Sequence, residues 1–127
     1  MTELEPAGEL QTRTLAMPAD ANPSGDIFGG WVLSQMDIAG GIWASQHAAG
    51  RVATVAVDAM SFIRPVNVGD VLCVYARTVR QGRTSLSVGI EAWVLRERVN
   101  ERLKVTEGVF TFVAIDADGK PRPISVG

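Results

Sequence analysis

The residues best suited to chemistry lie in one stretch of the chain, between positions 22 and 37. Asp37 is a carboxylate among apolar neighbours, and such a carboxylate can serve as a general base or as a nucleophile. Gly40 and Gly41 follow it although glycine destabilises a helix by about 1 kcal/mol, so they leave room for another group beside the carboxylate. The alternative is a solvent-facing aspartate with incidental glycines.

Two further features precede Asp37. Gly29 and Gly30 open the expected helix, where unpaired N–H groups and a partial positive charge can stabilise a carbonyl oxygen as it becomes an oxyanion. An ordinary helix-capping loop is the alternative. Asn22 precedes Pro23, which biases it to an extended conformation. Taken alone, Asn22 is better explained as the residue that organises an Asx-turn.

One long helix is expected to position these residues, from about Gly29 to about Ala49. A turn-rich loop over residues 18–30 leads into it, and Gly50 follows at the position of a C-terminal cap. A helix of about 20 residues is about 30 Å long, at 1.5 Å per residue. Its apolar stripe, spaced by three and four residues, consists of Val32, Met36, Ala39 and Trp43.

Five other segments have the pattern of strands, and the connections between them are mostly short. Residues 51–63 are apolar on both faces, which is typical of a central strand covered on both sides. Residues 96–104 are charged and are expected to form a solvent-facing hairpin loop. One helix against one antiparallel sheet makes an α+β architecture. The expected strands are Leu10–Met17, Arg51–Ile63, Asp70–Arg80, Leu86–Val94 and Val105–Ile115.

Composition and charge restrict the class of protein further. With 127 residues, 46% of them hydrophobic and 20% charged, the chain is expected to form one soluble domain. A net charge of −2 argues against a general nucleic-acid binder. The single cysteine, Cys73, excludes an intrachain disulfide and fits a reducing compartment. No signal peptide and no membrane-spanning stretch is recognisable, so a cytoplasmic protein that does not bind membranes is expected.

A longer pattern resembles a known family, the YciA-type acyl-CoA thioesterases, which are bacterial relatives of the long-chain acyl-CoA hydrolases. The resemblance covers nearly the whole chain from residue 14 to residue 124. The motif reads Asn22-x-x-Gly25-x-x-Phe28-Gly29-Gly30-Trp31, with Asp37 after it. Further similar segments are Thr54–Asp70, Val79–Ser85 and Val109–Ile115.

The resemblance implies a hotdog fold, in which a curved antiparallel sheet of about five strands wraps one central helix. It implies one thioesterase domain over residues 1–127, with a loose N-terminal tail at 1–8. The implied reaction is hydrolysis of acyl-CoA to free fatty acid and coenzyme A, and no cofactor is expected because coenzyme A is part of the substrate. The implied assembly is a homodimer that forms the active sites, joined further into a hexamer (a trimer of dimers) or a tetramer.

The resemblance also implies roles for individual residues. Asp37 corresponds to the catalytic carboxylate on the helix, and Asn22 to an asparagine that the facing subunit contributes to the same site. Separately from the resemblance, the N–H groups at the helix start predict that Gly29 and Gly30 bind the thioester carbonyl.

Coenzyme A carries phosphates, and four arginines fall in one stretch of this chain: Arg64, Arg77, Arg80 and Arg83. Arginine binds phosphate through paired donors. Arg64 and Arg83 lie in the similar segments, as does Ser85, and these three residues are the predicted coenzyme A contacts. The alternative is that the arginines are solvated strand ends.

Several other chemistries lack the residues they need. There is no Gly-x-Ser-x-Gly motif, and the single histidine, His47, is expected to contact the last carbonyls of the helix. With one histidine and one cysteine, no zinc site is expected, and Cys73 is expected in the core. The absence of a suitably placed histidine also disfavours a 3-hydroxyacyl dehydratase. A non-catalytic acyl-CoA binding or sensing module stays open as the other alternative.

Overall fold

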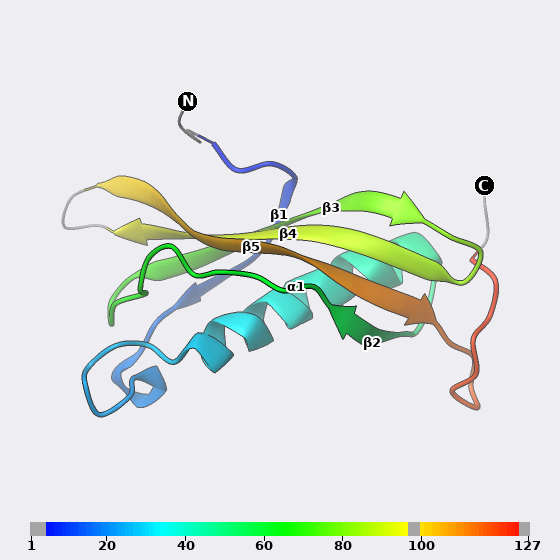
Figure 1. Ribbon diagram of the computed structural model, residues 1–127, viewed down its shortest axis with the longest axis horizontal. Helices are drawn as coiled ribbons and strands as arrows, with labels where there is room; N and C mark the ends of the chain where they lie inside the picture. Colours follow the sequence, from blue (N-terminus) through cyan, green and yellow to red (C-terminus); the bar gives the residue numbers. More distant parts are fainter. Residues whose placement is uncertain (1–4, 97–99, 125–127) are drawn as a thin grey trace.

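The computed structural model describes residues 5–96 and 100–124, in which one long helix lies against one five-stranded sheet (Figure 1). The elements in chain order are β1 (Glu9–Leu15), the short 3-10 helix η1 (Pro18–Asp20), α1 (Gly29–Ala48), β2 (Val52–Val57), β3 (Val71–Gln81), β4 (Ser85–Arg96) and β5 (Glu101–Ala114). The sheet is antiparallel throughout, in the order β1-β3-β4-β5-β2. The predicted α+β architecture and its element order are confirmed.

The core lies between α1 and the sheet face that curves around it (Figure 1). The predicted apolar stripe of α1 is buried there and packs against alternate residues of β4: Leu86, Val88, Ile90, Ala92 and Val94. Gly40 lies at the closest approach, because a Cβ at this position would lie 2.6 Å from Ile90 Cδ1 and 2.9 Å from Phe112 Cζ. Helix–sheet packing therefore accounts for Gly40, whereas a Cβ on Gly41 would have only ordinary contact, 4.0 Å from Phe112.

The strand predicted as a central one, over residues 51–63, is instead the edge strand β2. Val55 is 57% exposed and Val57 is 48% exposed in the isolated chain. Beyond Val57 the chain still follows β5, with Asp58 N donating to Val109 O at 3.0 Å and Ile63 N to Val105 O at 2.8 Å. The prediction was wrong because an apolar pattern on both faces does not by itself determine which strands become the neighbours of a segment.

The charged segment predicted as a solvent-facing loop, residues 96–104, belongs largely to the hairpin of β4 and β5. Arg96 ends β4 in a partly buried position, and Lys104 in β5 is buried. The prediction was wrong for these two residues, because charged side chains that are paired or hydrogen-bonded can lie inside a strand. Residues 97–99 lie outside the described part of the chain.

The C-terminus of α1 and the N-terminal segment are each held by hydrogen bonds in which one partner is a backbone group. Ala49 ends α1 in the left-handed conformation, at a φ of 54°, and the following residue, Gly50, donates its N–H to Ser45 O at 3.0 Å. Arg122 Nη2 donates to Ala48 O at 2.9 Å, which places a cation at the helix C-terminus. In the predicted tail, residues 1–4 lie outside the described part, and Ala7 N donates to a carboxylate of β4.

No helix in the described residues has the length and hydropathy needed to cross a membrane.

Candidate active site

Asp37 lies in the third turn of α1, partly buried, and is hydrogen-bonded to the edge strand β2. The hydroxyl of Thr54 donates to Asp37 Oδ1 at 2.6 Å. Within the described residues no donor contacts Oδ2, so one carboxylate oxygen is held and the other is left for a substrate or a water. Thr54 was not predicted as a site residue, although it is the one polar residue in the strand Val52–Val57 and that signal could have identified it.

Asn22 organises its own loop. Its side-chain oxygen accepts hydrogen bonds from Ser24 N at 3.0 Å and Asp26 N at 3.1 Å, and its backbone N–H donates to Asp26 O at 2.7 Å. This is the Asx-turn that the sequence left open as the alternative. The side-chain amide nitrogen has no acceptor in the described part of the chain, so its N–H groups can still contact a ligand.

The start of α1 is open to a ligand. Phe28 at the N-cap makes no side-chain capping hydrogen bond, and among the described residues no acceptor lies against the N–H groups of Gly29 and Gly30. A Cβ on Gly30 would meet nothing within 4 Å. The unpaired N–H groups and the helix dipole therefore face accessible space, which is the arrangement that can stabilise a developing negative charge.

Asp37 and the helix start are too far apart to act on one carbonyl within a single chain. Asp37 is eight positions after Gly29, which corresponds to about 12 Å along the helix axis at 1.5 Å per residue. The Asp37 side chain leans towards the helix start, but by much less than this distance. A base and an oxyanion donor must each lie about 3 Å from the reacting atoms.

A cavity of about 310 Å³ lies beside the helix start. Its walls come from the loop before α1, the first turns of α1 and the loop between β2 and β3. Most of its lining is apolar, which suits an aliphatic group, and Arg64 adds a charge to its lining. The lining residues are Ile27, Gly29, Val32, Phe62, Ile63, Arg64, Pro65 and Val66.

The predicted coenzyme A residues do not come together within one chain. Arg64 Nη1 donates to Lys104 O at 2.6 Å, near the start of β5. Arg83 lies in the β3–β4 turn, next to Thr84, whose carbonyl accepts from Ala114 N at 2.9 Å at the far end of β5. Lys104 and Ala114 are ten residues apart, or about 33 Å in a strand. Ser85 begins β4 at the same end as Arg83.

The residues that were assigned no catalytic role lie where the sequence placed them. His47 Nδ1 lies 2.8 Å from Trp43 O, and its ring stacks on the Trp43 ring with the centroids 4.1 Å apart. Cys73 is a free, buried cysteine in β3. The expectation for Cys73 is confirmed, whereas His47 contacts the carbonyl of Trp43, which precedes the last four carbonyls of α1.

Comparison with known proteins identifies the family. The description of the thioesterase superfamily matches residues 24–100. The chain is 59% identical over 124 residues to the acyl-CoA thioester hydrolase YciA of Salmonella typhimurium, a match that covers 95% of this chain and 93% of that protein. The same hydrolase of Escherichia coli K12 is 56% identical over 95% of this chain and 94% of its own length.

Among solved structures, the hexameric thioesterase y2039 from Yersinia pestis superposes with a TM-score of 0.93 at 55% identity, covering 97% of this chain and all of that one. HI0827, a hexameric broad-specificity acyl-coenzyme A thioesterase, superposes with a TM-score of 0.92 at 50% identity, covering 96% of this chain and 84% of its own. Motif, fold and these likenesses agree, and the chain belongs to the thioesterase superfamily, among the YciA-type acyl-CoA thioester hydrolases of the hotdog fold.

Proposed function

We propose that this protein hydrolyses acyl-CoA to free fatty acid and coenzyme A, with Asp37 either activating a water as a general base or attacking as the nucleophile itself. The observation that carries the proposal is the Asp37 carboxylate, which Thr54 holds by one oxygen while the other is left for the reaction. A non-catalytic binding module would have no need of a carboxylate held in this way.

Two copies of the chain form each active site in this proposal. The support is the separation of about 12 Å between Asp37 and the helix start, because a partner chain can place its own groups where one chain cannot. The edge strand β2 is a suitable contact, since it carries Thr54 and exposes Val55 and Val57. Pairing of two β2 edges would join the sheets and bring the Asn22 loop of one copy towards Asp37 of the other.

Further assembly of these dimers into a hexamer is proposed because y2039 and HI0827 are hexameric. Light scattering of the purified protein measures the assembly directly. A monomer at working concentration would contradict both the hexamer and the two-chain site.

The chemistry needs one base and one oxyanion site, because a thiolate leaves without help from a strong acid. Asp37 takes a proton from a water, and the oxygen of that water attacks the thioester carbon. The N–H groups at Gly29 and Gly30 of the other copy stabilise the oxyanion, and the carbon–sulfur bond then breaks as the thiolate leaves. The side-chain amide of Asn22 orients the water or the carbonyl. In the competing route Asp37 attacks directly and forms a mixed anhydride.

Thioester cleavage tests the proposal, followed with a thiol reagent over short- to long-chain acyl-CoAs. Asp37→Asn is expected to lower kcat about 100-fold or more, the size expected for a general base. Asp118→Asn, in an exposed turn, is the matched control and should leave kcat unchanged. If the wild type binds acyl-CoA without cleaving it, the binding-module alternative holds. Full activity in Asp37→Asn would leave the hydrolase and remove the role of Asp37.

Single-turnover reaction in oxygen-18 water separates the two routes. Direct attack incorporates the label into Asp37 when the anhydride is hydrolysed at the protein carbonyl. Attack by water places the label only in the released fatty acid, so a labelled Asp37 peptide would exclude the simple water route.

A further inference from the structure

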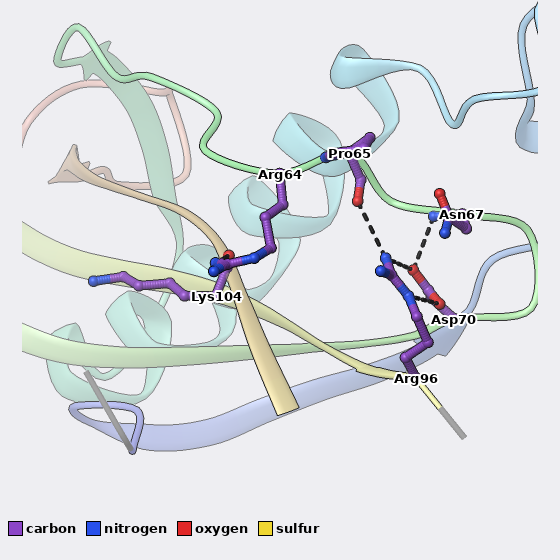
Figure 2. Close-up of polar contacts among 6 residues, drawn as sticks. All are labelled: Arg64, Pro65, Asn67, Asp70, Arg96 and Lys104. Carbon is purple, nitrogen blue, oxygen red and sulfur yellow. Dashed lines mark hydrogen bonds and ion pairs between the residues drawn. The ribbon is translucent and has the colours of Figure 1, made fainter. Parts of the chain in front are cut away.

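A partly buried ion pair lies beside the site without taking part in the proposed chemistry (Figure 2). Arg96 Nε donates to Asp70 Oδ1 at 3.0 Å, and Arg96 Nη2 donates to Asp70 Oδ2 at 2.9 Å. The side chain of Asp70 is 4% exposed and that of Arg96 is 25% exposed. The hydrogen bonds to Asp70 raise the pKa of Arg96 above its ordinary value, so the guanidinium remains charged.

Both members of the pair also hold backbone groups of the β2–β3 loop (Figure 2). Asp70 Oδ2 accepts from Asn67 N at 2.8 Å, and Arg96 Nη2 donates to Pro65 O at 3.4 Å. Pro65 lines the cavity beside the helix start. The ion pair therefore connects the end of β4 to one wall of that cavity.

The tight turn between Asn67 and Asp70 extends this connection. Asp70 N donates to Asn67 O at 3.0 Å, and Gly69 supplies the positive φ of 94° that the turn requires. Gly69 N donates to Ala16 O at 2.8 Å, and Ala16 N donates to Asp70 O at 2.9 Å. The turn is thus held from β4 by the ion pair and from the end of β1 by two backbone hydrogen bonds.

From this turn, hydrogen bonds continue to Asn22. Asn67 forms a β-bridge with Asp26, and Ile27 N donates to Val66 O at 3.1 Å. Asp26 in turn donates its N–H to Asn22 Oδ1 and accepts the Asn22 N–H. An unbroken series of contacts therefore runs from Arg96 through Asp70, Asn67 and Asp26 to Asn22.

Stability alone is a poor explanation for such a pair. Desolvation offsets the attraction between the charges of a buried ion pair, and solvent screening weakens that of an exposed one, so this partly buried pair adds little net stability. The two hydrogen bonds from Arg96 instead fix the orientation of the Asp70 carboxylate, in which Oδ2 also accepts the N–H of Asn67. Asn67, held in this way, is the residue that forms the bridge to Asp26.

We propose that Asp70 and Arg96 are positioning residues, which set the Asn22 loop and the adjoining cavity wall for catalysis. The inference rests on the proposed function through the role of Asn22. Neither residue lines the cavity beside the helix start, and their effect on the reaction passes through Asn67 and Asp26.

Two variants test the pair in the full-length protein. Arg96→Lys keeps the positive charge but cannot bind both carboxylate oxygens, and Asp70→Asn removes the negative charge with little change of shape. Arg122→Lys is the matched control, because Arg122 also holds two backbone carbonyls, Ile115 O and Ala48 O, but at the opposite end of α1. All three variants are expected to lower Tm.

Only the variants of the pair are expected to change the Asn22 loop. Hydrogen exchange of the Asp26 and Asn67 amides, measured at the same interval below the Tm of each variant, should be at least about fivefold faster in Arg96→Lys than in Arg122→Lys. The kcat of Arg96→Lys should also fall at least about fivefold, whereas that of Arg122→Lys should not. A change of about fivefold is in the lower range of the coupling between contacting residues. Equal exchange rates in the two variants would overturn the inference. If Asp70→Asn does not fold, Arg96→Lys still decides.

A double-mutant cycle separates this inference from the proposed function. If the pair acts through Asn22, Arg96→Lys should lower kcat much less in an Asn22→Ala background than in the wild type. Full additivity of the two losses would reject the inference and leave the role of Asn22 intact. If Asn22→Ala keeps full kcat, the role proposed for Asn22 fails, and the exchange rates alone decide whether the pair positions the loop.

Discussion

The hydroxyl of Thr54 on β2 lies 2.6 Å from Asp37 Oδ1 on α1, and this hydrogen bond joins the helix to the edge strand of the sheet. It limits rotation of the carboxylate and leaves Oδ2 unpaired within the described residues. The same strand exposes Val55 and Val57, so the carboxylate is held next to the edge at which a second copy is proposed to bind.

Thr54→Val removes this hydrogen bond with little change of shape, and kcat is expected to fall about tenfold or more. A hydrogen bond to a charged group contributes about 1.5–3 kcal/mol, and its loss lets the carboxylate rotate out of position. Steady-state kinetics on one acyl-CoA measure the effect, with Thr54→Ser expected to restore most of kcat. Thr111→Val, another strand threonine, whose hydroxyl has no partner among the described residues, is the control. Wild-type kcat in Thr54→Val would contradict this role.

Charge reversal at Arg64 or at Arg83 is expected to raise KM for acyl-CoA about tenfold while kcat changes about twofold or less. Loss of a phosphate contact weakens ground-state and transition-state binding equally. The two residues lie at opposite ends of β5, so each single variant is measured separately. Arg80→Glu is the control, because Arg80 is an exposed arginine of the same stretch that is not among the predicted coenzyme A contacts. An unchanged KM in both variants would remove the phosphate role.

Adjacent glycines of α1 are expected to respond in opposite ways to alanine. Gly40→Ala should lower the free energy of unfolding by about 1–3 kcal/mol, because the new methyl group meets Ile90 and Phe112. Gly41→Ala should raise it by up to about 1 kcal/mol, because alanine favours the helix and has room. Thermal unfolding measures both. Since Gly41 lies one turn beyond Asp37, its variant should nevertheless lower activity, and full activity would show that the space beside the carboxylate is not used.

Alkaline pH is expected to destabilise the fold through Tyr75, the only tyrosine of the chain. Burial raises the pKa of Tyr75 above its ordinary value of about 10, and Cys73 adds to the effect. The folded protein holds the phenolic proton more tightly than the unfolded chain, so stability falls as the pH rises from about 10 through the folded pKa. Tyr75→Phe should show a smaller loss of Tm over that range, and an identical loss would contradict the prediction. The phenolate absorbance reports the titration directly.

The local pattern of the sequence was enough to predict the elements of the fold. A stripe at three-to-four spacing specified α1, and alternating or continuous apolar runs separated by turn formers specified the strands, because these signals lie within single segments. The edge position of β2 and the strand positions of Arg96 and Lys104 did not follow from such patterns. They depend on which strands become neighbours and on partners far away in the chain, such as Asp70 for Arg96.

The candidate site divides in the same way. Residue type, spacing and family resemblance were enough to select Asp37, Asn22 and the helix-start glycines, because all of them lie within one short segment of the sequence. The tertiary structure alone brought Thr54 to Asp37, placed Arg64 and Arg83 at opposite ends of β5, and linked Asp70 to the Asn22 loop. The physical reason is that hydrogen bonds act over about 3 Å in space, whatever the separation along the chain.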